Sequence, residues 1–409
     1  MRPEKYSTSV SSCRPVRAPR RIDQPLVRQA IGILMALAMV TLCCCASDVR
    51  TATQPAAPAE EAKLEWIRPS RDGTGFVGSQ SGTPFIAWGF NYDHDQTGRL
   101  LDDYWQDHWP IVVEDFQEMK ALGANVVRVH LQVARFMEAP DKPNKSALEQ
   151  LAQMVKLAER TGLYLDITGL GCYQKKDVPA WYDAMDAAGR WEVQALFWES
   201  IARTCADSPA VFCYDLMNEP VLPGQDKSET EWLLGEFGGK HFVQRIALDL
   251  AGRTREQVAK AWVDKLAAAI RKHDKRHMIS VGVIPWAHVW PAARPLFYSK
   301  DVGESLDFVS VHFYPKQGEV EKALAALAVY EVGKPLVIEE MFPLSCSQEE
   351  LAAFIAGSRK IADGWITFYW GQTIEDYAQE KSGIQNAIMG RWLEYFKAKA
   401  PEMKKGAKK

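Results

Sequence analysis

Short apolar segments alternate with longer amphipathic segments along the chain from Phe85 onward. Apolar runs of strand length, each bounded by polar or turn residues, predict eight β-strands. The predicted strands cover residues 85–92, 125–130, 163–170, 211–220, 277–284, 307–314, 335–340 and 364–371. Because helical spacing fills the segments between them, the pattern is typical of repeated strand–helix units in a parallel sheet.

Two of the intervening helices can be bounded from the sequence. Ser146 and Glu149 have the spacing of a capping box and predict a helix that ends at Gly162. A second helix is expected from about Arg255, where four apolar residues follow at intervals of four: Val258, Trp262, Leu266 and Ile270. Eight such units predict the α/β class and a closed (β/α)8 TIM barrel as a single catalytic domain.

Polar residues collect at the last positions of the predicted strands. In a (β/α)8 barrel this is the end at which reactive groups lie. The residues at these positions are Asn91, Arg128, His130, Thr168, Asn218, Glu219, His312, Tyr314, Glu340 and Trp370. The sequence therefore predicts a polar site at one end of the barrel.

The seventh run ends in two consecutive carboxylates, Glu339 and Glu340. Side chains alternate along a strand, so Leu336, Ile338 and Glu340 share one face. This parity predicts Glu340 at the barrel mouth and Glu339 outside the barrel, paired with a neighbouring cation. Asn218 and Glu219 are also adjacent, and both can face the site only if the fourth strand twists or bulges there.

Two motifs resemble a known enzyme family. Residues 214–220 read Tyr-Asp-Leu-Met-Asn-Glu-Pro, and residues 334–341 read Lys-Pro-Leu-Val-Ile-Glu-Glu-Met. From about residue 64 to 395 the chain is similar to glycoside hydrolase family 5, the cellulase and mannanase family. The resemblance implies that Glu219 is the acid/base and Glu340 the nucleophile. Glu339 stands where the family usually has Gly, and Met341 where it has an aromatic residue.

The resemblance also implies roles for the other residues of the predicted site. Arg128 and Tyr314 would hold the nucleophile, and His312 would support the acid/base and the substrate. Asn218 would hydrogen-bond the sugar's 2-hydroxyl group, and Trp370 would form a sugar platform. Asn91 is a further expected substrate contact, and Trp88 and Trp286 are either sugar platforms or core residues. The third predicted strand lacks the His that many family members carry, and an insertion at 221–252 is expected to shape the cleft.

These features predict a retaining glycoside hydrolase that acts on a β-linked glycan of the β-glucan or β-mannan type. Retention requires two carboxyl groups about 5 to 5.5 Å apart and a covalent glycosyl-enzyme intermediate. A transglycosylase with the same site and a non-catalytic carbohydrate-binding barrel are the alternatives. We expect no cofactor, and no CxxC or His-rich spacing indicates a metal site.

Charge and composition limit the partners and divide the chain. The first 30 residues carry seven Lys or Arg against two acidic residues, so the rest of the chain has a net charge of −8. An acidic body disfavours nucleic acid as a partner. We therefore expect a monomer whose partner is a carbohydrate, with a catalytic domain at 63–400 and a basic tail at 401–409.

The N-terminal segment predicts export. The basic start is followed by thirteen uncharged residues at 30–42 and then by Cys43, Cys44 and Cys45, which is typical of an export signal at 1–47. A Pro/Ala-rich linker follows at 48–62. Cleavage near Ser47, a retained membrane anchor and acylation of Cys45 in a lipoprotein-like box remain open, so the protein would be extracellular, periplasmic or membrane-anchored.

Four cysteines remain outside the leader: Cys172, Cys205, Cys213 and Cys346. An exported domain can pair such residues in disulfides, although their spacing does not determine the connectivity.

Overall fold

The structure is a computed structural model that describes residues 63–379 and 383–405. The predicted export signal, the predicted linker and the last residues of the basic tail lie outside these ranges. Within them, no helix has both the length and the apolar character that crossing a bilayer requires. The helix α12 (Ile384–Met403) continues past residue 400, where the catalytic domain was predicted to end.

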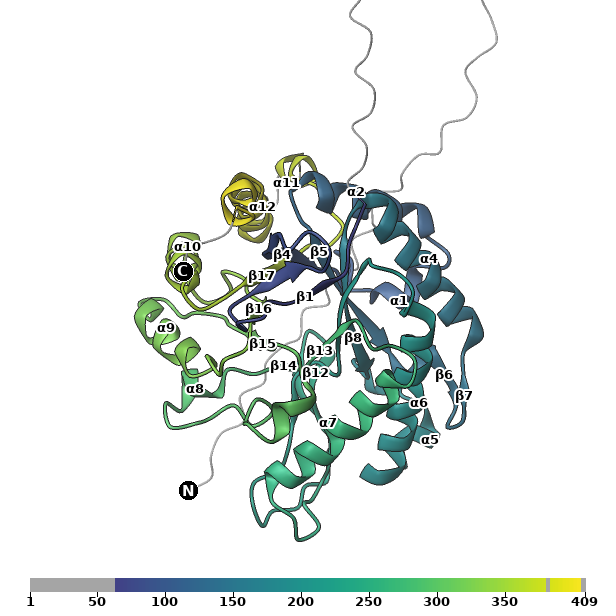
Figure 1. Cartoon of the computed structure of the whole chain (residues 1–409). Coiled ribbons are helices and arrows are strands. Elements are labelled where there is room, and N and C mark those ends of the chain that lie inside the picture. The colour runs from purple at the N-terminus through teal and green to yellow at the C-terminus, as the bar shows by residue number, and fades with distance from the viewer. Residues whose placement is uncertain (1–62, 380–382, 406–409) are drawn as a thin grey trace, which may run out of the picture. The chain divides into compact units, whose positions relative to one another are not determined.

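A parallel barrel with surrounding helices confirms the predicted fold (Figure 1). All eight predicted apolar runs contribute to it, and the fifth run is divided into two short strands. The barrel strands are β4 (Ala87–Asn91), β5 (Val126–Gln132), β8 (Tyr164–Gly171), β9 (Val211–Asp215), β13 (Met278–Ser280), β14 (Gly282–Val283), β15 (Val309–His312), β16 (Leu336–Glu340) and β17 (Gly364–Phe368).

The barrel closes through the divided fifth strand. β13 pairs with β9, and β14 pairs with β15, so the two halves connect the ends of the sheet. Between them, the Tyr298 hydroxyl donates to the carbonyl of Val281 (2.5 Å) and accepts from the amides of Val281 (3.0 Å) and Ser310 (2.9 Å). The Tyr298 hydroxyl thus supplies hydrogen bonds where the backbone ladder is interrupted, which meets the requirement that buried backbone groups be paired.

Helices cover the outside of the barrel (Figure 1). The fifth strand is followed only by the short α8 (Trp286–Val289) and a 3-10 turn at Val302–Ser305. The longer helices are α2 (Trp109–Ala121), α4 (Lys145–Thr161), α6 (Ala187–Cys205), α7 (Arg255–Arg271), α9 (Val320–Ala328), α10 (Gln348–Ser358) and α12, and the remaining short ones are α1 (Leu101–Tyr104), α3 (Val133–Phe136), α5 (Ala180–Asp183), α11 (Ile374–Gln379) and a 3-10 turn at Lys175–Asp177.

The sequence predicted the start of α7 and the end of α4 correctly but not the N-cap of α4. The side chain of Asn144 accepts hydrogen bonds from the amides of Ser146 and Ala147, so Asn144 and not Ser146 is the N-cap of α4. The helix ends at Gly162 in the left-handed conformation, as predicted. α7 begins as predicted, with a capping box formed by Thr254 and Gln257.

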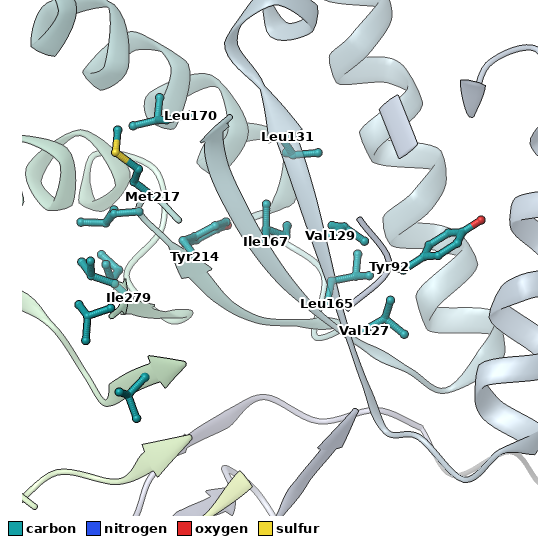
Figure 2. Close-up of a cluster of buried hydrophobic side chains, with 14 of the residues drawn as sticks. Tyr92, Val127, Val129, Leu131, Leu165, Ile167, Leu170, Tyr214, Met217 and Ile279 are labelled. Carbon is teal, nitrogen blue, oxygen red and sulfur yellow. The ribbon is translucent and has the colours of Figure 1, made fainter. Parts of the chain in front are cut away.

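Strand alternation separates an apolar layer from the barrel interior. Figure 2 shows Val127, Val129 and Leu131 of β5 beside Leu165 and Ile167 of β8 in the layer that packs against the helices. The residues between them on each strand point into the barrel. Full burial of each such aliphatic side chain contributes about 1.5–3 kcal/mol. The outward layer therefore stabilises the barrel, and the inward positions are left for polar groups.

A small antiparallel sheet closes the end of the barrel opposite the polar residues. It consists of β1 (Ile67–Pro69), β2 (Phe76–Gly78) and β3 (Pro84–Phe85). The Phe76 ring lies edge-on to Phe212 and Phe308 of the barrel floor, at centroid distances of 5.2 and 5.3 Å. This apolar plug leaves the C-terminal ends of the strands as the open face.

Candidate active site

Arg128 organises the polar end of the barrel. It points inward from β5 and has no exposed surface. One terminal nitrogen, Nη1, donates to Asn91 Oδ1 (2.9 Å) and Glu340 Oε1 (2.7 Å). The other, Nη2, donates to Asp215 Oδ2 (2.8 Å) and Asn218 Oδ1 (2.9 Å). The guanidinium fork thus fixes four side chains that come from three strands or the loops after them.

Glu340 is held as a carboxylate from two sides. Arg128 contacts its Oε1, and the Tyr314 hydroxyl donates to its Oε2 at 2.6 Å. Only 11% of the side chain is exposed, so the carboxylate is nearly surrounded by its donors. Both donors hold the carboxylate in a fixed orientation, which is what a nucleophile needs.

Glu219 reaches the same site through an unusual backbone conformation. Its φ is +49°, in the left-handed region, just after β9 ends. That turn places the adjacent side chains of Asn218 and Glu219 in one site, which regular strand alternation forbids. The predicted departure from regular strand geometry is therefore present, as a left-handed residue after the strand.

His312 joins the carboxylates. Its Nδ1 donates to Glu219 Oε1 (2.9 Å), and its Nε2 donates to Glu339 Oε2 (3.2 Å). Burial disfavours the charged imidazole, but Glu340, Glu219 and Glu339 outweigh it and raise the pKa of His312 to about 10. His312 is therefore a cation at neutral pH, with both nitrogens donating.

The prediction that Glu339 of the seventh strand points out of the barrel is wrong. Leu336 and Ile338 belong to the layer under the helices, whereas Val337 belongs to the barrel interior. Glu339 is two positions after Val337, so its side chain also points into the barrel, and it has no exposed surface. The cation that pairs with Glu339 is inside the barrel as well, since Glu339 Oε2 lies 3.4 Å from Arg128 Nη2.

Glu340 enters the site in spite of its parity because the strand register changes beside it. The pairing of β15 with β16 shifts between Val311 and His312, so that His312 lies opposite Glu340. A bulge of this kind brings consecutive residues to one side of a sheet. Both Glu339 and Glu340 consequently face the interior.

Two further buried carboxyl groups, Asp166 and Asp215, lie deeper in the barrel and were missing from the predicted site. Asp215 accepts from Arg128, from the Thr168 hydroxyl (2.8 Å) and from the amide of Gly282 (2.8 Å). Burial and Glu339 raise the pKa of Asp215 to about 6, against the lowering effect of Arg128. The sequence could have indicated Asp166, because it lies two positions before Thr168 on the same strand and its side chain therefore points to the same face.

Asp166 and Glu339 act as a carboxylic acid beside a carboxylate. Burial and the charge of Glu339 raise the pKa of Asp166 well above its usual range. Burial also opposes ionisation of Glu339, but Arg128 and His312 outweigh it and lower its pKa to about 2. The protonated form of Asp166 is therefore favoured beside the ionised Glu339.

Gly282 makes room for this charged network. A Cβ at that position would lie 2.5 Å from Glu339 Oε2 and 2.7 Å from His312 Nε2. No side chain fits there without displacing the network. The backbone of Gly282 also accepts from the amide of Glu219 (2.9 Å), which fixes the left-handed turn.

Four of the predicted substrate contacts, Trp88, Asn91, Arg128 and His312, are corrected by burial. Trp88 is fully buried under α12, where its ring stacks on Phe396 with a centroid distance of 4.4 Å, so Trp88 is a core residue. The Asn91 side-chain amide donates to the carbonyls of Glu339 and Thr367, and its oxygen accepts from Arg128. Asn91 therefore positions other groups of the site. Arg128, Asn91 and His312 have no exposed surface and make their hydrogen bonds to other groups of the protein, so they position the site.

A substrate contact requires exposed surface. Tyr314 and Trp370 are partly exposed and Trp286 is exposed, whereas Asn218 is buried. The Asn218 amide donates to the carbonyl of Phe242 (2.9 Å), and its second hydrogen is left for a ligand. Trp370 lies parallel to His94, with the ring centroids 5.4 Å apart. Trp286 stacks with Trp290 and is 37% exposed.

A metal ion does not suit this site. Glu219, His312 and Glu340 each place one donor atom within 4.8 Å of the others, which is close enough for shared coordination. However, a metal-binding imidazole must offer a lone pair, and the doubly donating cation His312 has none. The residues described here favour a network of ion pairs.

The insertion after the fourth strand forms a small three-stranded sheet. Its strands are β10 (Pro220–Val221), β11 (Leu233–Phe237) and β12 (Lys240–Arg245). It supports the site, since its Phe242 carbonyl accepts from Asn218. The remaining two-stranded pair, β6 (Met137–Ala139) and β7 (Lys142–Pro143), follows the second barrel strand.

The cysteines play no part in this geometry. Cys172, Cys205, Cys213 and Cys346 are free thiols, and the first three are buried. The disulfides that an exported domain allows are therefore not formed among them.

Solved structures with the same architecture include several glycosidases. The exo-β-1,4-mannosidase of Opitutaceae bacterium strain TAV5 has a TM-score of 0.61 and 16% identity, covering 82% of this chain and 62% of that one. The endo-1,4-β-mannanase of Rhizomucor miehei (TM-score 0.54, 14% identity) covers 83% of this chain and 100% of its own. The endoglucanase catalytic domain of Thermobifida fusca (0.53, 14%) covers 82% and 97%.

At these identities the structural likeness shows the fold alone, and this chain spans less than two thirds of the exo-mannosidase. No curated protein sequence matches it significantly. The sequence profile of the cellulase family, however, matches residues 81–373, which is more than half of the chain and contains every carboxylate of the site. The chain therefore belongs to glycosyl hydrolase family 5, the cellulase family, and is a glycosidase.

Proposed function

We propose that the protein is a retaining β-glycosidase in which Glu340 is the nucleophile and Glu219 the acid/base. The observation that carries this proposal is the distance between the two carboxylates. Their closest oxygens, together with a His312 nitrogen, lie within 4.8 Å of one another. Retaining enzymes have carboxyl groups about 5–5.5 Å apart, whereas inverting enzymes leave about 6.5–9.5 Å for a water molecule.

In the first step, the Glu340 carboxylate attacks the anomeric carbon. The bond from that carbon to the glycosidic oxygen breaks, and the departing oxygen takes the proton of Glu219. Arg128 and Tyr314 fix the attacking carboxylate in place, and cationic His312 orients Glu219 through a hydrogen bond to Oε1. The other oxygen of Glu219 is left to hold the proton.

In the second step, Glu219 acts as a base. It removes a proton from water, which attacks the anomeric carbon and releases Glu340. The free hydrogen of the Asn218 amide is available for the sugar's 2-hydroxyl, a contact that strengthens in the transition state. Arg128 and the Phe242 carbonyl hold this amide in a fixed orientation.

We further propose β-1,4-linked mannan or glucan oligosaccharides as substrates. The solved structures of the same fold that are named above act on β-1,4-mannosides or were determined with cellotetraose. A panel of β-manno- and β-gluco-oligosaccharides, followed by proton NMR, tests the proposal. We expect the β-anomer as the first product from one of the two series. Initial appearance of the α-anomer would refute the retaining mechanism, and cleavage of neither series would refute the substrate class.

A further inference from the structure

The hairpin of β11 and β12 bridges one side of the barrel mouth. Its His241 amide donates to the carbonyl of Tyr173 (2.7 Å), in the loop after the third strand. The Phe242 and Tyr173 rings are in contact, with a centroid distance of 5.5 Å. The hairpin leaves the barrel after the fourth strand, so it connects the loops of two neighbouring strands.

The same hairpin extends as far as the loop of the first strand. The Lys240 ammonium lies 3.2 Å from the position of a Cβ on Gly98, which follows β4. The hairpin thus contacts the loop after the third strand and lies close to the loop after the first. A polymer that is cut internally must leave the site on both sides, and this bridge obstructs one of them.

Buried polar atoms without partners occur around the bridged side. They are His130 Nε2 on the second strand, His241 Nδ1 on the hairpin, Asp93 Oδ1 after the first strand and Trp370 Nε1 after the eighth. A buried polar atom without a partner destabilises the folded protein. Hydroxyl groups of a bound sugar would satisfy such atoms, and His130 is already oriented by the Tyr173 hydroxyl at 2.5 Å.

Exposed aromatic side chains line a cavity together with the residue that follows Glu219 in the chain. A cavity of about 290 Å³ begins at Pro220, the residue after Glu219, and is lined by Trp286 and Trp290. The two indole rings stack at 5.3 Å, and Trp290 is 58% exposed. Exposed indole faces suit the apolar faces of sugar rings.

From this asymmetry we infer that the enzyme removes single sugars from the non-reducing end of its substrate. This inference rests on the proposed function. The terminal sugar would bind under the hairpin, where Glu340 attacks its anomeric carbon. The rest of the chain would lie over the Trp286 and Trp290 rings and leave after Glu219 protonates its oxygen. Water then releases the single sugar from Glu340.

Oligosaccharides of five β-1,4-linked mannose or glucose units, labelled at the reducing end, test the inference with the wild-type enzyme. The first labelled product should be the tetrasaccharide, followed in order by shorter ones. Labelled products of mixed length from the beginning would show internal cleavage and overturn the inference while leaving the proposed function intact. If neither series is cleaved, and aryl β-mannosides and β-glucosides also stay intact, the proposed function itself fails.

A second test addresses the hairpin. His241→Ala removes one polar contact to the terminal sugar but keeps the backbone hydrogen bond to Tyr173. We expect kcat/KM for the disaccharide to fall roughly 10-fold, since one hydrogen bond is worth about 1 kcal/mol or somewhat more. Lys227→Ala, an exposed position in the same insertion, is the matched control and should match wild type. Equal activity of both variants would exclude the hairpin from substrate binding.

Discussion

Glu219, the proposed acid/base, has a strained backbone. A non-glycine residue in the left-handed region costs of order 1 kcal/mol or more, so neighbouring contacts must hold it there. The amide of Glu219 donates to the carbonyl of Gly282 (2.9 Å), and its carbonyl accepts from the amide of Gln244 (3.4 Å). The turn is thus fixed by the fifth strand on one side and by the insertion on the other.

The role of Glu219 predicts a specific pattern of rescue. In Glu219→Ala, a dinitrophenyl β-glycoside should still form the glycosyl-enzyme, because this leaving group needs no proton, but water should release the sugar slowly. Added azide needs no base and should restore turnover, giving the β-glycosyl azide. NMR of the product checks this. An unaccelerated reaction in azide would place the acid/base elsewhere.

Glu339 is predicted to act through His312. Glu339→Gln removes one of the charges that raise the pKa of His312 to about 10, so this pKa should fall and the variant should lose activity on the alkaline side at a lower pH than wild type. Removing one partner of a buried ion pair also costs about 3–5 kcal/mol of stability. A pH–rate profile of kcat/KM measures the shift. An unchanged profile with reduced stability alone would make Glu339 purely structural.

The pH dependence of stability has a definite sign for His312. Its pKa is raised in the folded state, so its stabilising contribution is complete below the unfolded value of 6.5 and is lost as the pH rises toward 10. Glu339 has a lowered pKa and contributes in the opposite range, above 4.5, with loss as the pH falls toward 2. Within the window from 6.5 to 10, the free energy of unfolding should decline less with pH in Glu339→Gln than in wild type.

At the scale of elements, the pattern of apolar runs was sufficient to predict every barrel strand and the polar character of the strand ends. The side-chain direction at two strands was not predicted correctly. On β16 the register shift opposite His312 cannot be seen in one strand's own sequence, because it depends on the neighbouring strand. On β4 the information was present: Trp88 is three positions from inward Asn91, so the two lie on opposite faces.

The cap of α4 gives an element-scale test. Asn144→Ala should lower the free energy of unfolding by about 1 kcal/mol, because it removes the acceptor for two amides of the first turn. Ser146→Ala, the position that the capping-box pattern favours, should change it by no more than about 0.5 kcal/mol. Chemical denaturation of both variants provides the comparison. The reverse order would restore Ser146 as the cap.

At the scale of the whole molecule, the barrel brings together residues that are far apart in the chain. Arg128 and Glu340, which form the central ion pair, are 212 positions apart. The sequence predicted these two residues because each ends a strand of a closed barrel. It predicted that the insertion shapes the cleft but not the hairpin's contact with Tyr173, because this contact depends on the tertiary fold.

We propose that the chain is exported and that Cys45 carries a lipid anchor, since a basic segment, an apolar segment and three cysteines precede the Pro/Ala-rich linker. Several acyl chains, at about 0.8 kcal/mol for each buried CH2, should hold the full chain on a bacterial membrane. Fractionation of cells that express the full chain or Cys45→Ala measures this. Activity in the soluble fraction for both proteins would exclude the anchor.

The assignment of Glu340 as the nucleophile is tested most directly by replacing it and supplying an external nucleophile. Glu340→Gly should abolish hydrolysis of an activated aryl β-glycoside, and azide should restore cleavage by entering the space that the carboxylate leaves. The product should then be the α-glycosyl azide, because a single displacement inverts the anomeric centre. Glu339→Gly is the matched variant and should give no such product. If Glu339→Gly forms the α-azide and Glu340→Gly does not, the nucleophile is Glu339 and this account of the site is wrong.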